Sequence, residues 1–502
     1  MQQKSELPEG WIEISLECIL FSLESGSRPK GGVRGILKGI PSIGGEHLNE
    51  NGGFRFDKIK FVAEEFFGKM NQGIIKVNDI LIVKDGATTG KVAIVKKDFP
   101  YDRAAVNEHV FLCRPYSELS SDYIFYFLFS EIGQKRILNN FRGSAQGGIN
   151  KSFAPNTMMP LSPLSEQYRI VSAIEALFAR LDAANEKLDR VPEILKKFRE
   201  SVLAAACEGR LTERWRMENQ EIEDGNELIK TVLANRFDIW KEQEKSKKKY
   251  TVPQEVDTSD LPPLPDSWSY ATLDQLVQEG RPIIYGIIKP GPDISDGVPY
   301  VRVNEMANGK ISDISNLKRA SMEIAKKFSR ATLLSGDLLI SKDGTIGKVA
   351  IVPPKLEGGN INQHIVRATI HPFVDKNYIV NSIRSLQSQK WLDTEKKGVA
   401  LQGVNVEDFR RLPLPVPPFL EQQEIVRRVD ALFAFADSIE SNVTAAREKT
   451  EKLRQSILAK AFSGQLVETE AEIAKREGRD YETAEVLLDK IKAEKGNKEK
   501  KR

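Results

Sequence analysis

The chain has 502 residues, which is too long for a single hydrophobic core and predicts two to four domains. Forty per cent of the residues are apolar, which is enough for folded domains, yet no run of 18 apolar residues exists that could cross a membrane. The net charge of +3 is close to neutral for this size, so charge alone does not indicate strong unaided binding to nucleic acid.

Cysteine usage and the N-terminal sequence bear on the cellular compartment. The three cysteines, Cys18, Cys113 and Cys207, lie far apart, and any disulfide scheme leaves one of them unpaired. The first ten residues, MQQKSELPEG, lack the apolar segment of a secretory signal. We therefore expect a reducing, cytoplasmic setting.

In chain order, the first half of the sequence returns in the second half. The opening LPEGW at 7–11 recurs as LPDSW at 264–268, an offset of 257. At an offset of 258, DILIVKDG at 79–86 matches DLLISKDG at 337–344, and both lead into GKVAIV. An apolar strand, a glycine-containing turn and a second β-branched strand predict a β-hairpin, with turns that differ by one residue between the copies.

From Asn107 onward the offset is 255 without a gap as far as Leu211 and Leu466. It carries Asn-Glu-His109 onto Asn-Gln-His364, and Gly-Ile-Asn150 onto Gly-Val-Asn405. Residues 122–141 show a helical pattern. The proline-rich stretches that follow, PNTMMPLSPL and PLPVPPF, predict an extended strap that leads into the next element.

That next element is a long amphipathic segment, residues 166–211, whose apolar residues recur at steps of four and three. A copy lies 255 residues later, so two long helices are expected to seal each other's apolar stripes as an antiparallel coiled coil. Each would span about 65 Å at ~1.5 Å per residue. Pro192 should kink or interrupt the first helix, whereas the second has Arg447 there and should be straighter. The seam positions chosen as candidates for the subunit interface are Ile170, Leu177, Leu181, Ile425, Val429 and Leu432.

Two stretches, 212–260 and 467–502, are rich in glutamate and lysine. They are interpreted as a charged linker with some helical content and a charged C-terminal tail. Either they are solvated helix or disordered chain, or they make electrostatic contact with DNA or a partner. The sequence leaves both alternatives open.

Several similarities to enzyme motifs do not hold. The segment at 86–91, GATTGK, has three residues between its glycines where a phosphate loop needs four, and valine follows the lysine, so a hairpin turn is the better interpretation. Pro417-Pro418-Phe419 is similar to the end of a DNA adenine methyltransferase motif, but Val416 replaces its amide or carboxylate. The histidines, His47, His109, His364 and His371, show no metal-ligand spacing. At His109 and His364, a structural role and a nucleic-acid contact both remain open.

The repeated openings, the GDLLISKDGTIGKVAIV hairpin, NQH, QGVN, and PPFLEQQEIVRRVDALF leading into the long helix resemble the specificity subunit of type I restriction-modification enzymes. The resemblance implies an α/β fold with two tandem target-recognition domains, each with a strongly curved sheet, separated by two long antiparallel coiled-coil helices with pseudo-two-fold symmetry. The expected boundaries are 1–163 and 261–418 for the recognition domains, 164–211 and 419–466 for the helices, 212–260 for the linker and 467–502 for the tail.

The same resemblance implies a non-catalytic subunit that binds double-stranded DNA. Each domain would read one half of a bipartite asymmetric target, and the helices would set the spacing. Two methyltransferase subunits would dock on the helices, and translocase-nuclease subunits would join through the complex. S-adenosylmethionine, ATP and magnesium are expected on those partners, and no metal site is expected here.

The stretches where the copies agree least, 20–78 and 278–336, are expected to carry the specificity, because domains that read different sequences must differ where they read. Candidates for base contacts are Glu46, His47, Asn49, Arg302, Asn304 and Glu305. Candidates better suited to phosphates are Lys84, Thr88, Thr89, Lys91, Lys342, Thr345 and Lys348. A single-chain restriction-modification enzyme, or a coiled-coil DNA-binding scaffold without sequence preference, remains the alternative.

Overall fold

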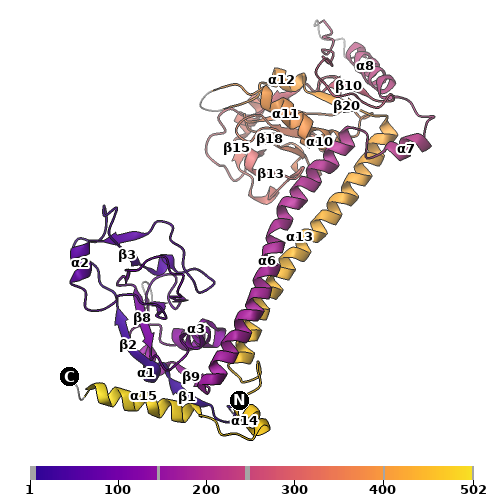
Figure 1. Cartoon of the computed structure of the whole chain (residues 1–502). Helices are drawn as coiled ribbons and strands as arrows, with labels where there is room; N and C mark the ends of the chain where they lie inside the picture. Colours follow the sequence, from indigo (N-terminus) through magenta and orange to yellow (C-terminus); the bar gives the residue numbers. More distant parts are fainter. Residues whose placement is uncertain (1–6, 144–146, 243–248, 399–401, 500–502) are drawn as a thin grey trace. The chain divides into compact units, whose positions relative to one another are not determined.

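The computed structural model describes residues 7–143, 147–242, 249–398 and 402–499 (Figure 1). The chain forms two compact units. The first consists of Met1–Asp189 and Thr444–Arg502, and the second of Arg190–Val443. Each unit therefore combines one globular domain with a part of both long helices.

In its described residues, the first unit contains three small sheets. Strand β1 (Ile12–Ser15) pairs antiparallel with the strap, β9 (Met158–Leu161). A four-stranded antiparallel sheet has the order β2-β8-β5-β6, with bounds Leu20–Ser25, Val110–Pro115, Ile80–Val83 and Val92–Ile94. A three-stranded sheet has the order β4-β3-β7, with bounds Lys60–Val62, Ile40–Ile43 and Ala105–Val106. The pairing of β3 with β7 is parallel.

The second unit repeats these sheets. Strand β10 (Ser269–Thr272) pairs with the strap β20 (Pro413–Val416). The four-stranded sheet has the order β11-β19-β16-β17, with bounds Ile284–Tyr285, Ile365–Ala368, Leu338–Ser341 and Val349–Ile351. The three-stranded sheet has the order β15-β12-β18, with bounds Arg319–Ala320, Val298–Val301 and Asn360–Ile361, and a short hairpin adds β13 (Met306–Ala307) and β14 (Lys310–Ile311). Both predicted hairpins, β5–β6 and β16–β17, are confirmed.

The helical pattern predicted at 122–141 is confirmed, and it is divided into two helices, α3 (Ser121–Phe129) and α4 (Glu131–Leu138). The Ser130 side chain accepts a hydrogen bond from the backbone N–H of Gly133, so it caps the second helix and ends the first. The other short helices of this unit are α1 (Leu16–Ile19), α2 (Glu64–Gly68) and α5 (Phe153–Asn156). Those of the second domain are α9 (Met322–Lys327), α10 (Lys376–Arg384), α11 (Leu386–Thr394) and α12 (Val406–Arg410).

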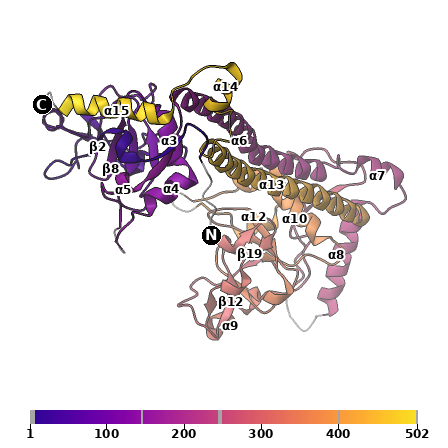
Figure 2. The same cartoon turned by 90° about the horizontal axis from the view of Figure 1, so that it is seen from below.

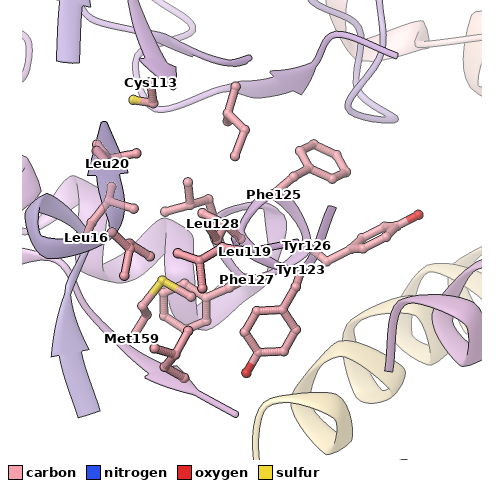
Figure 3. Close-up of a cluster of buried hydrophobic side chains, with 14 of the residues drawn as sticks. Leu16, Leu20, Cys113, Leu119, Tyr123, Phe125, Tyr126, Phe127, Leu128 and Met159 are labelled. Atoms are coloured by element: carbon pink, nitrogen blue, oxygen red, sulfur yellow. The ribbon is translucent and has the colours of Figure 1, made fainter. Parts of the chain in front are cut away.

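The core of the first unit gathers around α3. Figure 3 shows side chains of this helix, including Tyr123 and Phe127, grouped with Leu16, Met159 and their neighbours. Tyr123 and Phe127 are fully buried, because α3 lies among the sheet, the strap and the long helices. The Tyr123 hydroxyl donates to the strap carbonyl of Pro160 at 3.0 Å, which satisfies the one polar atom of this side chain. Burial of each large apolar side chain contributes roughly 1.5–3 kcal/mol.

The two long helices are α6 (Leu164–Cys207, 44 residues) and α13 (Phe419–Ala461, 43 residues), which lie side by side (Figure 1). In the first unit, Arg447 pairs with Asp189 at 2.6 Å, and Arg454 pairs with Asp182. In the second unit, Arg199 pairs with Asp437 and Glu440, and Arg428 donates to the Leu211 carbonyl. Residue numbers rise along one helix as they fall along the other, so the helices are antiparallel in both units.

Both helices begin where they were predicted and end about one turn earlier. Gly209 and Gly464 follow the last turns with φ of 74° each, in the left-handed region that ends helices and favours glycine. The N–H of Leu211 then donates back to the Ala205 carbonyl at 3.0 Å, which closes the helix end.

Pro192 does not interrupt α6, which continues through it. Proline lacks an N–H, so the carbonyl of Leu188, four residues earlier, loses its helical donor. Arg447 supplies one instead: its guanidinium lies 3.5 Å from that carbonyl and 2.6 Å from the carboxylate of Asp189. Arg447 is the repeat equivalent of Pro192, so the residue that replaces the proline in one copy compensates for it in the other.

The charged stretches that follow each long helix contain α7 (Glu213–Glu218) and α8 (Gly225–Glu242) in one case, and α14 (Glu470–Glu477) and α15 (Ala484–Glu499) in the other. The expected helical content is present in both stretches, but α8 and α15 are neither disordered nor solvated on all faces. Each buries apolar residues in the core of its own unit: Leu228, Ile229 and Val232, or Leu487, Leu488 and Ile491. Figure 2 shows α15 lying along the domain that contains β2 and β8.

The two stretches are also structurally equivalent. The first N–H of α8 donates to the carbonyl of Ser267, and the first N–H of α15 donates to the carbonyl of Gly10. Ser267 and Gly10 are equivalent residues, each directly before the tryptophan of the repeated opening. The duplication therefore includes the linker and the tail, where the high glutamate and lysine content hides it in the sequence.

Candidate nucleic-acid interface

In the first unit, the turn of the β5–β6 hairpin packs against the residues that precede β8. The Lys84 N–H donates to the His109 carbonyl at 2.8 Å, and His109 Nδ1 is hydrogen-bonded to Asp85 Oδ1. The second unit has the same two contacts, each at 2.8 Å, between Lys342, Asp343 and His364. We call each lysine, aspartate and histidine set the His–Asp corner.

A glycine-containing loop closes each corner. The N–H of Ile149 donates to the Lys84 carbonyl at 2.8 Å, and a Cβ added at Gly148 would lie 2.6 Å from that carbonyl. In the second unit a Cβ at Gly403 would lie 2.2 Å from Asp343 Oδ1. A side chain at Gly148 would collide with the hairpin backbone, and one at Gly403 would displace the Asp343 carboxylate from its corner, so both copies carry a glycine two residues before the asparagine.

An asparagine connects each corner to the three-stranded sheet. The Asn107 side-chain oxygen accepts from the His109 N–H at 3.0 Å, and the Asn107 N–H donates to the carbonyl of Ile43, the last residue of β3, at 2.9 Å. The second unit repeats both bonds, at 3.2 and 3.1 Å, with Asn362, His364 and Val301. Each corner is thereby fixed beside the segment that follows β3 or β12.

For the two corner histidines, the structure shows a structural role, whereas contact with nucleic acid stays a prediction. Each imidazole is oriented by an aspartate, as a structural histidine would be. Each also keeps surface, because the side chains of His109 and His364 are 50% and 35% exposed.

The segment after β3 is a 3-10 turn, Gly45–His47. His47 is fully buried, and its Nδ1 accepts a hydrogen bond from the Gly44 N–H at 2.9 Å. Burial lowers the pKa of His47 below its ordinary value. The expectation that His47 offers its side chain to DNA is therefore wrong, because the ring closes the turn from inside.

The equivalent turn after β12 is Val303–Glu305. Glu305 folds back in the same way as His47: one carboxylate oxygen accepts from the Arg302 N–H at 2.5 Å, and the other accepts from Arg302 Nε at 2.7 Å. Glu305 is buried, and it holds the Arg302 guanidinium in an ion pair. Arg302 and Glu305 were both expected to contact bases, but in this structure they form hydrogen bonds and an ion pair with each other.

Asn49 was a third candidate for base contact, and its side chain is also occupied. Its oxygen accepts from the N–H groups of Asn51 and Gly53 at 2.9 and 3.0 Å, and its amide donates to the Phe54 carbonyl at 3.2 Å. This asparagine shapes a loop, which contradicts its assignment as a reader of bases. Glu46 and Asn304, by contrast, are both exposed.

The candidates for phosphate contact line the hairpin turns. Thr88 and Thr345 are exposed at the two tips. Thr89 is half-buried, and its hydroxyl donates to the Gly86 carbonyl of the same turn at 2.7 Å. Lys91 is only 14% exposed and pairs with Glu50, so it is not available as the phosphate contact that was expected.

The other lysines of this set keep part of their surface. Lys84 donates to the Glu108 carbonyl at 2.7 Å and is 30% exposed, and Lys342 pairs with Asp343 at 2.8 Å and is 19% exposed. Lys348 is half-buried. A phosphate would therefore have to compete with existing partners at Lys84 and Lys342.

The predicted seam residues divide into two groups. Ile170, Ile425 and Val429 are almost fully buried in the cores of their own units. They have no surface to offer another subunit, so their assignment to a subunit interface is wrong as a direct contact. Leu177, Leu181 and Leu432 are partly buried along the helices.

A buried glutamate at the start of each long helix explains the repeated tryptophan. Glu166 accepts from Trp11 Nε1 at 3.1 Å and from the Glu470 N–H at 2.9 Å. Glu421 accepts from Trp268 Nε1 at 2.9 Å and from Thr212 and Arg216. We call these contacts the Trp–Glu locks. Sequence reasoning did not identify them, although both copies carry the same Glu-Gln pair, 166–167 and 421–422.

Within the part of the chain that the structure describes, no group of three or more His, Cys, Asp or Glu side chains is arranged to hold a metal ion. In the same residues, no helix combines the length and the apolar content that a membrane span requires.

Both units share a His–Asp corner, an adjoining 3-10 turn and a part of both long helices.

The family described as "Type I restriction modification DNA specificity domain" matches residues 31–193 and 265–446, once in each repeat. The chain belongs to this family. Among type I specificity subunits, it is 34% identical to the EcoBI specificity subunit of Escherichia coli over 68% of this chain and 65% of that relative. It is 27% identical to the EcoDI specificity subunit of Escherichia coli over 86% of this chain and 88% of that relative.

A solved structure from work on complex assembly and conformational transition of the type I R-M system has the same fold. It superposes with a TM-score of 0.60 at 16% identity, over 92% of this chain and 99% of that one. This specificity subunit thus has the fold that its sequence predicted.

Proposed function

We propose that this specificity subunit recognises double-stranded DNA, and that each unit reads one half of a bipartite, asymmetric target. The observation that carries the proposal is that the two units share one part of the candidate interface and differ in the part beside it. The His–Asp corners repeat residue for residue, whereas the adjoining turns differ: Gly-Gly-Glu-His47 in one and Arg-Val-Asn-Glu305 in the other. A protein that binds one kind of polymer at two different sequences requires this combination.

The corners and hairpin tips suit the sequence-independent part of binding. Thr88 and Thr345 offer hydroxyls, and Lys84 and Lys342 offer ammonium groups beside them, all of which are common phosphate contacts. The two turns suit the sequence-dependent part. The net charge of +3 is small, so we expect strong DNA binding only in a complex whose other subunits add basic surface.

The long helices are proposed to dock two methyltransferase subunits, through which translocase-nuclease subunits join. Three of the six seam residues are buried and the other three are partly buried. We therefore assign docking to the apolar side chains that the helices leave exposed: Tyr168, Ile194, Leu420, Phe435 and Leu453, at 43–60% exposure. The subunit itself is proposed to be non-catalytic, with S-adenosylmethionine, ATP and magnesium held by the partners.

The helices are also proposed to set the spacing between the half-sites, because α6 and α13 each run from one unit into the other. Insertion or deletion within both helices should change the spacer, at ~1.5 Å of helix per residue against ~3.4 Å of duplex per base pair.

A domain exchange tests the proposal. Residues 1–163 are replaced by the matching domain of another family member, together with residues 467–502, because α15 belongs to the core of the first unit. The chimaera is expressed with methyltransferase subunits, and the methylated motif is found by sequencing modified bases in the host DNA. One half of the motif should change and the other half should stay. A change in both halves would refute independent reading, and DNA binding without any motif would favour a scaffold.

A further inference from the structure

The two 3-10 turns place one exposed side chain each at the same position of the fold. At the offset of 258, Gly44 corresponds to Arg302, Glu46 to Asn304 and His47 to Glu305. In both turns the last residue folds back on the first N–H, at 2.9 Å from His47 and at 2.5 Å from Glu305. The residue in the middle is therefore left to point outward, and both Glu46 and Asn304 are exposed.

The position of each turn is fixed against parts that the units share. Asn107 and Asn362 tie the last residues of β3 and β12 to the corners at 2.9 and 3.1 Å. In the first unit the turn is also in close contact with the hairpin, because a Cβ at Gly45 would lie 3.3 Å from the Thr88 hydroxyl. If the corners hold the DNA backbone in the same way, the two turns meet equivalent base pairs of their half-sites.

The chemistry of the two side chains differs in a way that separates bases. A carboxylate only accepts hydrogen bonds, and cytosine N4 is the donor that it meets in the major groove. An asparagine amide both donates and accepts, which matches N7 and N6 of adenine. Lys60 lies 2.6 Å from Glu46 and limits the repulsion between this carboxylate and phosphates.

Resting on the proposed function, we propose that Glu46 and Asn304 are the equivalent specificity-determining residues of the two units, with Glu46 reading cytosine and Asn304 reading adenine. His47, Glu305 and Arg302 act as positioning residues that hold the turns. This assignment narrows six sequence candidates to two. His47 and Glu305 are buried, Asn49 is hydrogen-bonded within its own loop, and Arg302 is paired with the buried Glu305, whereas the partner of Glu46, Lys60, is itself exposed.

The test uses the full chain in complex with its methyltransferase subunits. Glu46→Asn copies the residue of the second unit and should move the preference at one base pair of one half-site from cytosine to adenine, by about 10-fold in binding competition. Asn304→Glu should make the opposite change in the other half-site. Glu46→Gln is nearly isosteric, so it keeps the fold and should relax that same base pair. Glu50→Gln is the matched control, an exposed glutamate three residues beyond the turn, and should leave the motif unchanged.

The outcomes separate this inference from the proposed function. If the wild-type complex shows a bipartite motif and Glu46→Gln and Asn304→Glu leave every position of it unchanged, the inference is wrong while the function stands. An equal loss of affinity for all DNA sequences would also overturn it, since that result identifies a backbone contact. A wild-type complex without sequence preference would refute the proposed function itself.

Discussion

The Trp–Glu lock of the second unit gives a direct stability prediction. Glu421 is fully buried, and its carboxylate accepts from Trp268 Nε1 at 2.9 Å, from the Thr212 hydroxyl at 2.6 Å and from the Arg216 guanidinium at 2.9 Å. Glu421→Ala removes all of these acceptors at once. Arg216, whose side chain is 19% exposed, would then keep its charge without the carboxylate.

Glu421→Ala is expected to lower the free energy of unfolding of the second unit by about 3–5 kcal/mol, because removing one partner of a buried ion pair leaves the other charge uncompensated. Glu166→Ala should cost less, about 1–3 kcal/mol. Among the described residues the Glu166 carboxylate accepts from Trp11 and a backbone N–H, so its loss leaves uncharged donors unsatisfied and no uncompensated charge.

Hydrogen exchange followed by mass spectrometry is the suitable assay, because a chain of two units does not unfold in one step. Peptides covering 264–272 and 419–425 should lose protection in Glu421→Ala by the stated free energy. Glu193→Ala is the matched control on α6: this glutamate is 72% exposed and pairs with Lys197, so its loss should cost at most about 0.5 kcal/mol. A cost below about 1 kcal/mol for Glu421→Ala, or a larger cost for Glu166→Ala, would refute the reasoning.

Three further predictions follow from the same contacts. Ile425→Asp should unfold the second unit because the residue is fully buried, whereas Phe435→Ser, at 60% exposure, should leave circular dichroism unchanged and weaken methyltransferase binding in pull-down assays. Burial lowers the pKa of His371, so the stability that its neutral form contributes is present above pH ~6.5 and declines as the pH falls toward the folded pKa; thermal melts against pH should show this slope, and His371→Gln should reduce it. Arg447→Met should lower the opening free energy of the α6 peptides around Leu188, measured by hydrogen exchange, by about 0.5–1 kcal/mol, and by less in a Pro192→Ala background. Additive effects would contradict the contact with the orphaned carbonyl.

The sequence by itself determined the repeat, the hairpins, the straps and the two long helices. These features depend on local patterns: the spacing of apolar residues, the glycines of the turns and the prolines of the straps. The fixed offset between the two copies strengthens each of these predictions, because the same local pattern occurs twice in the chain and predicts the same element both times. The family followed from the same motifs.

Only the tertiary structure decided which of the candidate side chains are available. His47 and Glu305 differ in chemistry and looked like readers of bases, yet both fold back on their own turn. Their role depends on the direction of a side chain relative to a backbone N–H, which residue type does not fix. Lys91 is likewise unavailable as a phosphate contact, because it pairs with Glu50, a residue 41 positions earlier in the chain.

The burial of one face of α8 and of α15 was also decided only by the tertiary structure. Their high glutamate and lysine content is typical of solvated chain. The few apolar residues of each helix could be assigned to a core only once the structure showed the core that they pack against. Whether an amphipathic stretch is buried depends on a surface built by distant residues. Local propensity is therefore sufficient to predict the elements of this protein, whereas the partners of each side chain are set by contacts that the folded chain alone brings together.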